Sequence, residues 1–141
     1  MKKCKILVVD GQGGKLGKQI VESIKARLPE CGVLAVGTNA IATLAMQKGG
    51  ADEIATGENA VICCAKKVRV IIGPIGIAVA DSLMGEITPA MACAVGSSAA
   101  VKILIPINKC SNLIAGVKGI PVSRMIEDAI DLCEQALSEE E

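Results

Sequence analysis

Four glycines follow a short run of β-branched residues in the stretch "VVDGQGGKLGKQI", from Val8 to Ile20. Backbone N–H groups at the start of a helix bind phosphate, and glycine lets an anion approach the backbone closely. The spacing fits G-x-x-G-x-x-G, a variant of the dinucleotide-binding pattern, because Leu16 stands where G-x-G-x-x-G needs its third glycine. Residues 11–17, called the glycine turn below, therefore predict a phosphate site made by Gly11, Gln12, Gly13, Gly14, Leu16 and Gly17.

Two other interpretations of the glycine turn stay open. A P-loop fits less well, because Lys15 is followed by Leu16 instead of the hydroxyl residue that binds magnesium, and the spacing is too short. The glycines could also serve only to bring the helix close to the sheet, without any ligand.

The end of the second apolar run bears on which cofactor is expected. A dinucleotide site usually has an acidic residue there, which holds the adenosine ribose. Here Thr38 and Asn39 occupy the place, and both could hydrogen-bond a ribose or its phosphate. The sequence therefore predicts NAD or NADP, or otherwise another nucleotide.

Two more loops are expected beside the glycine turn, because the ligand crevice of an open parallel sheet lies at the carboxyl ends of the strands where the strand order reverses. The first contains Gly73, Pro74 and Gly76, and the second is "PINKC", from Pro106 to Cys110. The candidate catalytic residues at this rim are Glu86, Lys109 and Cys110. A cation beside a thiol favours the reactive thiolate. Each candidate also has an ordinary structural explanation, so no reaction is assigned.

Short β-branched runs alternate with helical patterns along the chain, which predicts an α/β fold. We expect one Rossmann-like domain over residues 1–141, with three α/β/α layers and a mainly parallel sheet of order 3-2-1-4-5. Strands are expected in 4–9, 31–37, 53–56, 68–76 and 101–108, with a possible sixth strand over 113–117. Helices are expected from Leu16 to Leu28, from Ala40 to Gly49-Gly50, near 59–66, over 77–84, from Pro89 to about Ser97, and after a Ser123 cap.

The charge and the residue types exclude several classes of function. The 15 basic and 15 acidic side chains cancel, and the only run of one sign is Glu139-Glu140-Glu141, so a nucleic-acid partner is not expected. The chain has no Phe, Tyr, Trp or His, which removes base-stacking platforms and the usual proton-transfer residue near neutral pH. Acid–base catalysis is therefore disfavoured.

The cysteines and the hydropathy indicate the compartment and the state of assembly. Seven cysteines without a C-x-x-C pair suggest neither a disulfide framework nor a metal site, and no signal peptide or membrane span is recognisable. A cytoplasmic protein without a membrane partner is expected. Hydrophobic residues make up 51% of the chain, more than a core of this size needs, which predicts a homo-oligomer, most simply a dimer.

The chain also resembles two known families. The stretch "GQGGKLGKQI" resembles the first turn of dihydrodipicolinate reductases, which use it to bind a nicotinamide cofactor. Nearly the whole chain resembles a family of short bacterial proteins known as domain of unknown function 3842, through "GTNAIAT" (37–43), "GADEIATGENAV" (50–61), "IIGPIGI" (71–77), "GEITPAMA" (85–92) and "KILIPINKC" (102–110). The second resemblance implies a Rossmann-like cytoplasmic protein and supplies no catalytic residues.

Together these observations favour a binding or regulatory module that holds a nucleotide phosphate at the glycine turn. A small NAD(P)-dependent oxidoreductase or a transferase using the same turn is the first alternative. An interaction module whose glycines serve packing is the second. The absence of His and Tyr, and a length too short for a separate substrate domain, favour binding.

Overall fold

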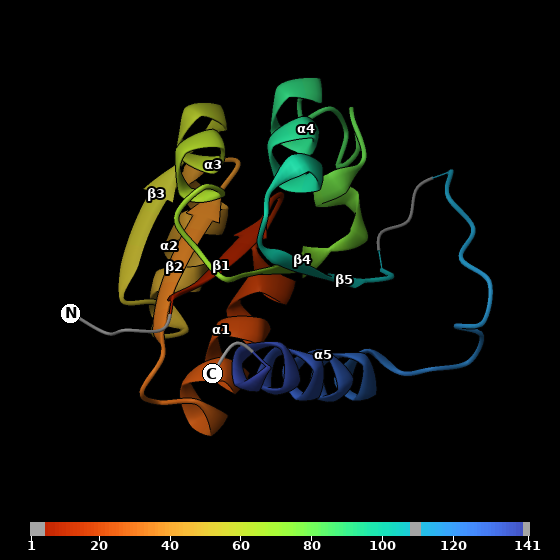
Figure 1. Cartoon of the computed structure of the whole chain (residues 1–141). Helices are drawn as coiled ribbons and strands as arrows, with labels where there is room; N and C mark the ends of the chain where they lie inside the picture. The colour runs from red at the N-terminus through yellow and green to blue at the C-terminus, as the bar shows by residue number, and fades with distance from the viewer. Residues whose placement is uncertain (1–4, 108–110, 140–141) are drawn as a thin grey trace.

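The computed structural model describes residues 5–107 and 111–139. Its centre is a five-stranded parallel sheet in the order β3-β2-β1-β4-β5 (Figure 1). The strands are β1 (Lys5–Asp10), β2 (Gly32–Gly37), β3 (Glu53–Thr56), β4 (Val70–Pro74) and β5 (Val101–Ile105). The predicted Rossmann-like fold and strand order are confirmed.

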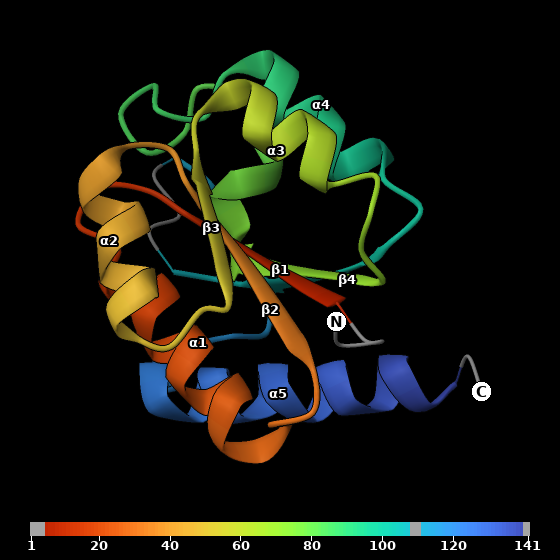
Figure 2. The same ribbon diagram turned by 90° about the vertical axis from the view of Figure 1, so that its left-hand side faces the viewer.

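Helices cover both faces of the sheet, as Figure 2 shows. They are α1 (Lys15–Arg27), α2 (Ala40–Lys48), α3 (Glu58–Cys64), the 3-10 helix η1 (Ile75–Ala78), α4 (Pro89–Ser97) and α5 (Val122–Ser138). Side chains of α1, α2 and α5 pack with Ile6 and Val8 on one face, and those of α3 and α4 pack with Leu7 and Val9 on the other. Successive residues of β1 thus supply two separate cores.

The central position of β1 places the glycine turn. Val8 lies opposite Ala35 of β2 on one side and opposite Ile72 of β4 on the other. Because the three strands are parallel, the segments that follow them leave the same edge of the sheet. The glycine turn and the Gly73–Gly76 stretch, which begins in the last two residues of β4, therefore lie at the ends of neighbouring strands, as predicted.

The structure corrects the helix expected over 77–84. Only a 3-10 helix, Ile75–Ala78, forms here, and a loop follows it. Asp81, Leu83 and Met84 have φ angles of 65°, 55° and 56°, so their backbone is left-handed and cannot continue a right-handed helix.

Two expectations near the C-terminal helix are also wrong. Residues 113–117 form no strand, and Gly116 and Gly119 turn the chain with φ angles of 86° and 77°, which breaks an extended segment. The cap of α5 is Pro121 instead of Ser123, which lies inside the first turn of the helix. Proline suits this place because it lacks the N–H group that would go unpaired there.

Candidate functional site

The glycine turn is a tight connection between β1 and α1. Gln12 and Gly14 have φ angles of 50° and 74°, and the Gly14 N–H donates to the Gly11 carbonyl at 3.0 Å. The helix begins at Lys15 directly afterwards. The N-terminus of α1 therefore lies at the carboxyl edge of the sheet, where the sequence predicts the ligand.

A buried carboxylate already occupies part of this helix N-terminus. Asp10, at the end of β1, is 4% exposed and accepts hydrogen bonds from the N–H groups of Gly17 at 2.6 Å and Gly11 at 2.8 Å. Burial raises the pKa of Asp10, the two N–H donors oppose this, and the negative charge of Glu86 adds to it. Asp10 thus caps α1, and the Gly17 N–H is not available to a phosphate.

Three of the glycines have a packing explanation. A Cβ atom on Gly14 would lie 2.6 Å from the Cα of Ala42, and one on Gly17 would lie 2.7 Å from the sulfur of Met46. These contacts bring α1 close to α2. A Cβ on Gly11 would meet the Leu83 side chain at 2.9 Å. The packing interpretation therefore accounts for Gly11, Gly14 and Gly17.

Gly13 differs from these three glycines. It is exposed, its φ angle lies outside the left-handed region, and a Cβ atom there would meet nothing within 4 Å. Within residues 5–107 and 111–139, the N–H groups of Gly13, Lys15 and Leu16 donate to no protein acceptor. Gly13 and Lys15 are exposed, so the glycine turn is open to an approaching group at these two residues, whereas Leu16 is buried.

The most connected polar group at the site is the carboxylate of Glu86. Its Oε1 atom accepts hydrogen bonds from the Gln12 N–H at 2.8 Å, the Thr38 hydroxyl at 2.5 Å and the Asn39 side-chain amide at 3.0 Å. Burial alone would raise the pKa of Glu86, but the hydrogen bonds from Thr38, Gln12 and Asn39 outweigh it and lower the pKa below its ordinary value. Donors from the ends of β1 and β2 thus converge on one anionic oxygen.

The loop that carries Glu86 has a strained backbone and is held in place by its contacts with Gly76. Left-handed backbone costs a residue with a side chain about 1–2 kcal/mol, and three such residues lie between Asp81 and Met84. The Ser82 hydroxyl donates to the Gly76 carbonyl, and Leu83 is buried. The loop therefore packs against Gly76, and Gly73, Pro74 and Gly76 are all buried.

A hollow of about 350 Å³ lies beside Gly13 on the surface of α1 and α2. Lys18 and Lys48 line it, together with the exposed apolar side chains of Ile41 and Leu44. It combines positive charge with an apolar wall, next to the open part of the glycine turn.

A comparison with known protein families matches residues 5–138 to Domain of unknown function (DUF3842). The chain belongs to this family. A search of curated proteins finds no match. In the described part of this DUF3842 chain, no helix is both long and apolar enough to cross a bilayer.

The DUF3842 chain brings only some of its predicted site residues together. Thr38 and Asn39 lie at the glycine turn with Glu86, the one candidate catalytic residue that the structure describes. Lys109 and Cys110 lie outside the described residues. Among the residues described, no group of three or more Cys, Asp and Glu side chains could hold a metal ion.

Sequence reasoning missed two roles of carboxylates. Asp10 caps α1, and the available signal is an aspartate directly before the glycines, seven residues from Gly17. Glu86 places a carboxylate beside Thr38 at the end of β2, where the local sequence has none. No local sequence pattern predicts the contacts of Glu86, because Glu86 and Gln12 are 74 residues apart.

Lowering the pH is expected to release the loop of Glu86. Because its pKa is lower in the folded protein than in the unfolded chain, Glu86 stabilises the fold above the unfolded pKa, and this contribution is lost as the pH falls through the folded pKa. Asp10 has the opposite sign: its raised pKa destabilises the fold at neutral pH, and protonation relieves this. In an NMR titration, the Gln12 amide proton should therefore shift at a pH below the ordinary carboxyl range. A Gln12 amide that titrates identically in Glu86→Gln would contradict this assignment.

Proposed function

We propose that this protein binds a nucleotide through the glycine turn. The observation that carries the proposal is the position of Glu86, whose Oε1 atom accepts three hydrogen bonds from Gln12, Thr38 and Asn39. Groups from two strand ends thus form a polar site at the point where the strand order reverses, which is where open α/β sheets bind their ligands.

Glu86 can supply the contact to the ribose. Its Oε2 atom accepts no hydrogen bond within the described residues and is available to a hydroxyl donor. In dinucleotide sites a carboxylate at the end of the second strand accepts from the ribose hydroxyls. Here a residue of the loop after β4 holds its carboxylate against Thr38, next to that strand end. A 2′-phosphate would meet this negative charge, so we propose NAD in preference to NADP.

The open part of the glycine turn suits the phosphates. The N–H groups of Gly13 and Lys15 have no protein acceptor in the described chain, and they lie at the positive end of the α1 dipole. Lys18 and Lys48 add positive charge beside Gly13. The buried Asp10 accepts from the N–H groups of Gly11 and Gly17 and not from these two donors.

Titration with NAD, NADP, ATP and coenzyme A, followed by thermal unfolding, tests the proposal. A ligand that binds only the folded protein raises the melting temperature with its concentration. NAD should bind about tenfold or more tightly than NADP, a difference of roughly 1.4 kcal/mol, and Glu86→Gln should reduce this difference. No shift with any of the four ligands would contradict nucleotide binding. Tighter binding of NADP would contradict only the role of Glu86.

The composition gives a second test of the same proposal. The chain contains no Trp or Tyr, so the near-ultraviolet absorbance of a nucleotide base stands out against the polypeptide. Mass spectrometry of an acid extract of gently purified protein should then identify the bound molecule. Cys63→Ser, which changes an exposed cysteine on α3, should leave the bound molecule in place.

A small NAD(P)-dependent oxidoreductase or a transferase remains the second candidate function, with Glu86, Lys109 and Cys110 as the candidate catalytic residues taken from the sequence. Turnover of NAD with a pool of metabolites would support it.

We also propose a cytoplasmic homodimer. The thiols of Cys63, Cys64, Cys93 and Cys133 are free, which suits a reducing compartment.

A further inference from the structure

The outer edge of β5 is an unprotected sheet edge. The Val101 N–H donates to the Arg69 carbonyl, on the β4 side. Because N–H groups alternate along a strand, those of Lys102 and Leu104 point away from β4, and within residues 5–107 and 111–139 no strand lies beside them. Exposed edges are commonly guarded by charged side chains or proline. The one charged residue of β5, Lys102, turns its ammonium group back to the Ser98 carbonyl at 2.7 Å.

The opposite edge of the sheet is better protected. β3 has four residues, begins with the exposed Glu53 and ends with the exposed Thr56. A short edge strand with a charge does not favour pairing with another chain. The two edges therefore differ in the way expected if only β5 meets a partner.

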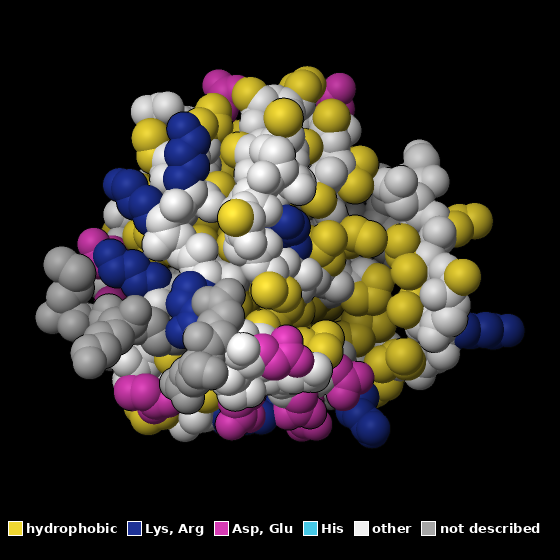
Figure 3. Space-filling model, viewed as in Figure 1, with side chains coloured by type: hydrophobic (Ala, Val, Ile, Leu, Met, Phe, Trp, Pro, Cys, Tyr) yellow, Lys and Arg dark blue, Asp and Glu magenta, His cyan; other side chains and the backbone are white. Residues whose placement is uncertain are grey.

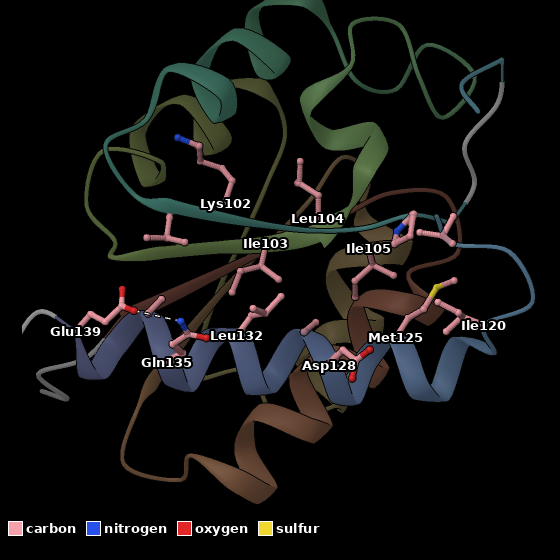
Figure 4. A pocket seen from close by; sticks show the side chains of 15 residues that line it. Lys102, Ile103, Leu104, Ile105, Ile120, Met125, Asp128, Leu132, Gln135 and Glu139 are labelled. Atoms are coloured by element: carbon pink, nitrogen blue, oxygen red, sulfur yellow. Dashed lines mark hydrogen bonds between the residues drawn. The ribbon is translucent and has the colours of Figure 1, made fainter. Parts of the chain in front are cut away.

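An apolar groove runs along β5 on the side of α5 (Figure 4). It has a volume of about 390 Å³, and Val101, Ile120 and Leu132 on its walls are 44%, 36% and 52% exposed. Figure 3 shows hydrophobic side chains gathered in this hollow above the acidic side chains of α5. Surfaces of this kind mark interfaces more often than they mark free surface.

We propose that the β5 edge and the adjoining face of α5 form a two-fold interface between two copies of this chain. The two β5 strands pair antiparallel around Ile103, so that Lys102 lies opposite the partner's Leu104. In this pair, the outward N–H group of each residue donates to the outward carbonyl of the other. The two-fold symmetry produces the same pair a second time, between Leu104 and the partner's Lys102. On the α5 side, Val101 lies opposite the partner's Ile105. The result is one continuous ten-stranded sheet across the dimer.

The opposite charges at the two ends of α5, Arg124 and Glu139, favour a second copy with this orientation. Figure 4 shows that Met125 lies below the Ile105 end of β5 and that Glu139 lies at the opposite end of the groove. A two-fold axis through Ile103 therefore sets the first turn of one α5 beside the last turn of the other. Arg124 in the first turn is exposed and lies 3.8 Å from Asp128 of the same helix, and Glu139 is exposed and accepts from the Gln135 side-chain amide at 3.2 Å. Contacts of this kind at the surface contribute little, so both charges can turn to a partner chain. Each Arg124 thus meets the partner's Glu139, and two opposite charges pair at each end of the interface.

Sedimentation of Leu132→Glu tests this interface, with Leu44→Glu as the matched control. Both leucines are 52% exposed, one in the β5 groove and one on α2, so neither change should unfold the protein. The wild type and Leu44→Glu should sediment with twice the chain mass of 14.4 kDa. Leu132→Glu should be monomeric, with a dimer dissociation constant raised about 100-fold or more, because it places a charge in the apolar groove. A monomeric wild type, or a dimeric Leu132→Glu, would overturn the proposal.

Two further experiments, a charge reversal and amide hydrogen exchange, test whether the β5 edge is the surface that forms the dimer. Arg124→Glu and Glu139→Arg should each weaken the dimer, and the double variant should restore it. The amides of Lys102 and Leu104 should be protected from hydrogen exchange in the wild type and should exchange rapidly in Leu132→Glu. A dimer in which these two amides exchange rapidly would use a different surface, and the β5 interface would then be wrong.

Discussion

Gly14→Ala is expected to lower the free energy of unfolding by about 3 kcal/mol, the largest stability effect that we predict. Gly14 has a φ angle of 74°, and a left-handed backbone costs alanine about 1–2 kcal/mol. The added Cβ would also lie 2.6 Å from the Cα of Ala42, a backbone atom that cannot turn aside. Overpacking of this kind costs about 1–3 kcal/mol. The melting temperature should fall by roughly 10 °C.

Gly13→Ala is the matched control for this change. It lies one residue away in the same turn, but its Cβ would meet nothing within 4 Å and its φ angle is outside the left-handed region. An alanine there should leave the stability unchanged or raise it by up to about 1 kcal/mol, because it restricts the unfolded chain. Calorimetry or chemical unfolding measures both variants. Equal losses at the two positions would mean that the packing of α1 on α2 is not what requires Gly14.

Gly13→Asp is expected to weaken nucleotide binding by about 100-fold while the protein stays folded. The new carboxylate would stand at the open part of the glycine turn and repel a phosphate there. It would also take up the N–H groups that the phosphate needs, and hydrogen bonds to a charged group contribute about 1.5–3 kcal/mol. Titration calorimetry with the nucleotide identified above measures the effect.

Gly96→Asp serves as the control for Gly13→Asp. Gly96 lies on α4, and a Cβ atom there also meets nothing within 4 Å, so the same charge is added at an open glycine elsewhere. Its affinity for the nucleotide should equal that of the wild type. If Gly13→Asp binds as tightly as Gly96→Asp, the phosphate does not lie at Gly13.

The sequence was sufficient for the regular elements of the sheet. Strand β3 has the predicted bounds, Glu53–Thr56, and α4 runs from Pro89 to Ser97 as expected, with the Thr88 hydroxyl accepting from the Met91 N–H. These elements follow from local signals, namely β-branched runs and a cap followed by proline. The 77–84 segment has a helical pattern of apolar residues, but the contacts of Ser82 and Leu83 with Gly76 hold the backbone in another conformation.

The site could be predicted only in part, because its key contacts join distant segments. The glycine turn marks the place, yet the pattern does not separate Gly14, which packs on Ala42, from Gly13, which packs on nothing. The left-handed backbone of Gly14 and its contact with α2 distinguish the two glycines, and both appear only in the structure. The contact between Glu86 and Thr38 depends likewise on a loop whose left-handed residues no propensity predicts.

The position of α5 bears on how the chain folds during synthesis. Its residues Ile126, Ile130 and Cys133 belong to the same core as β1 and α1, although α5 follows all five strands in the chain. Until α5 leaves the ribosome, α1 and α2 cover only part of that face of the sheet, and the side chains that pack on α5 stay exposed to water. The nascent chain can pair its strands early, but it can complete this core only after translation reaches residue 138. We therefore expect ribosome-bound chains that lack α5 to need chaperones more than the full chain does.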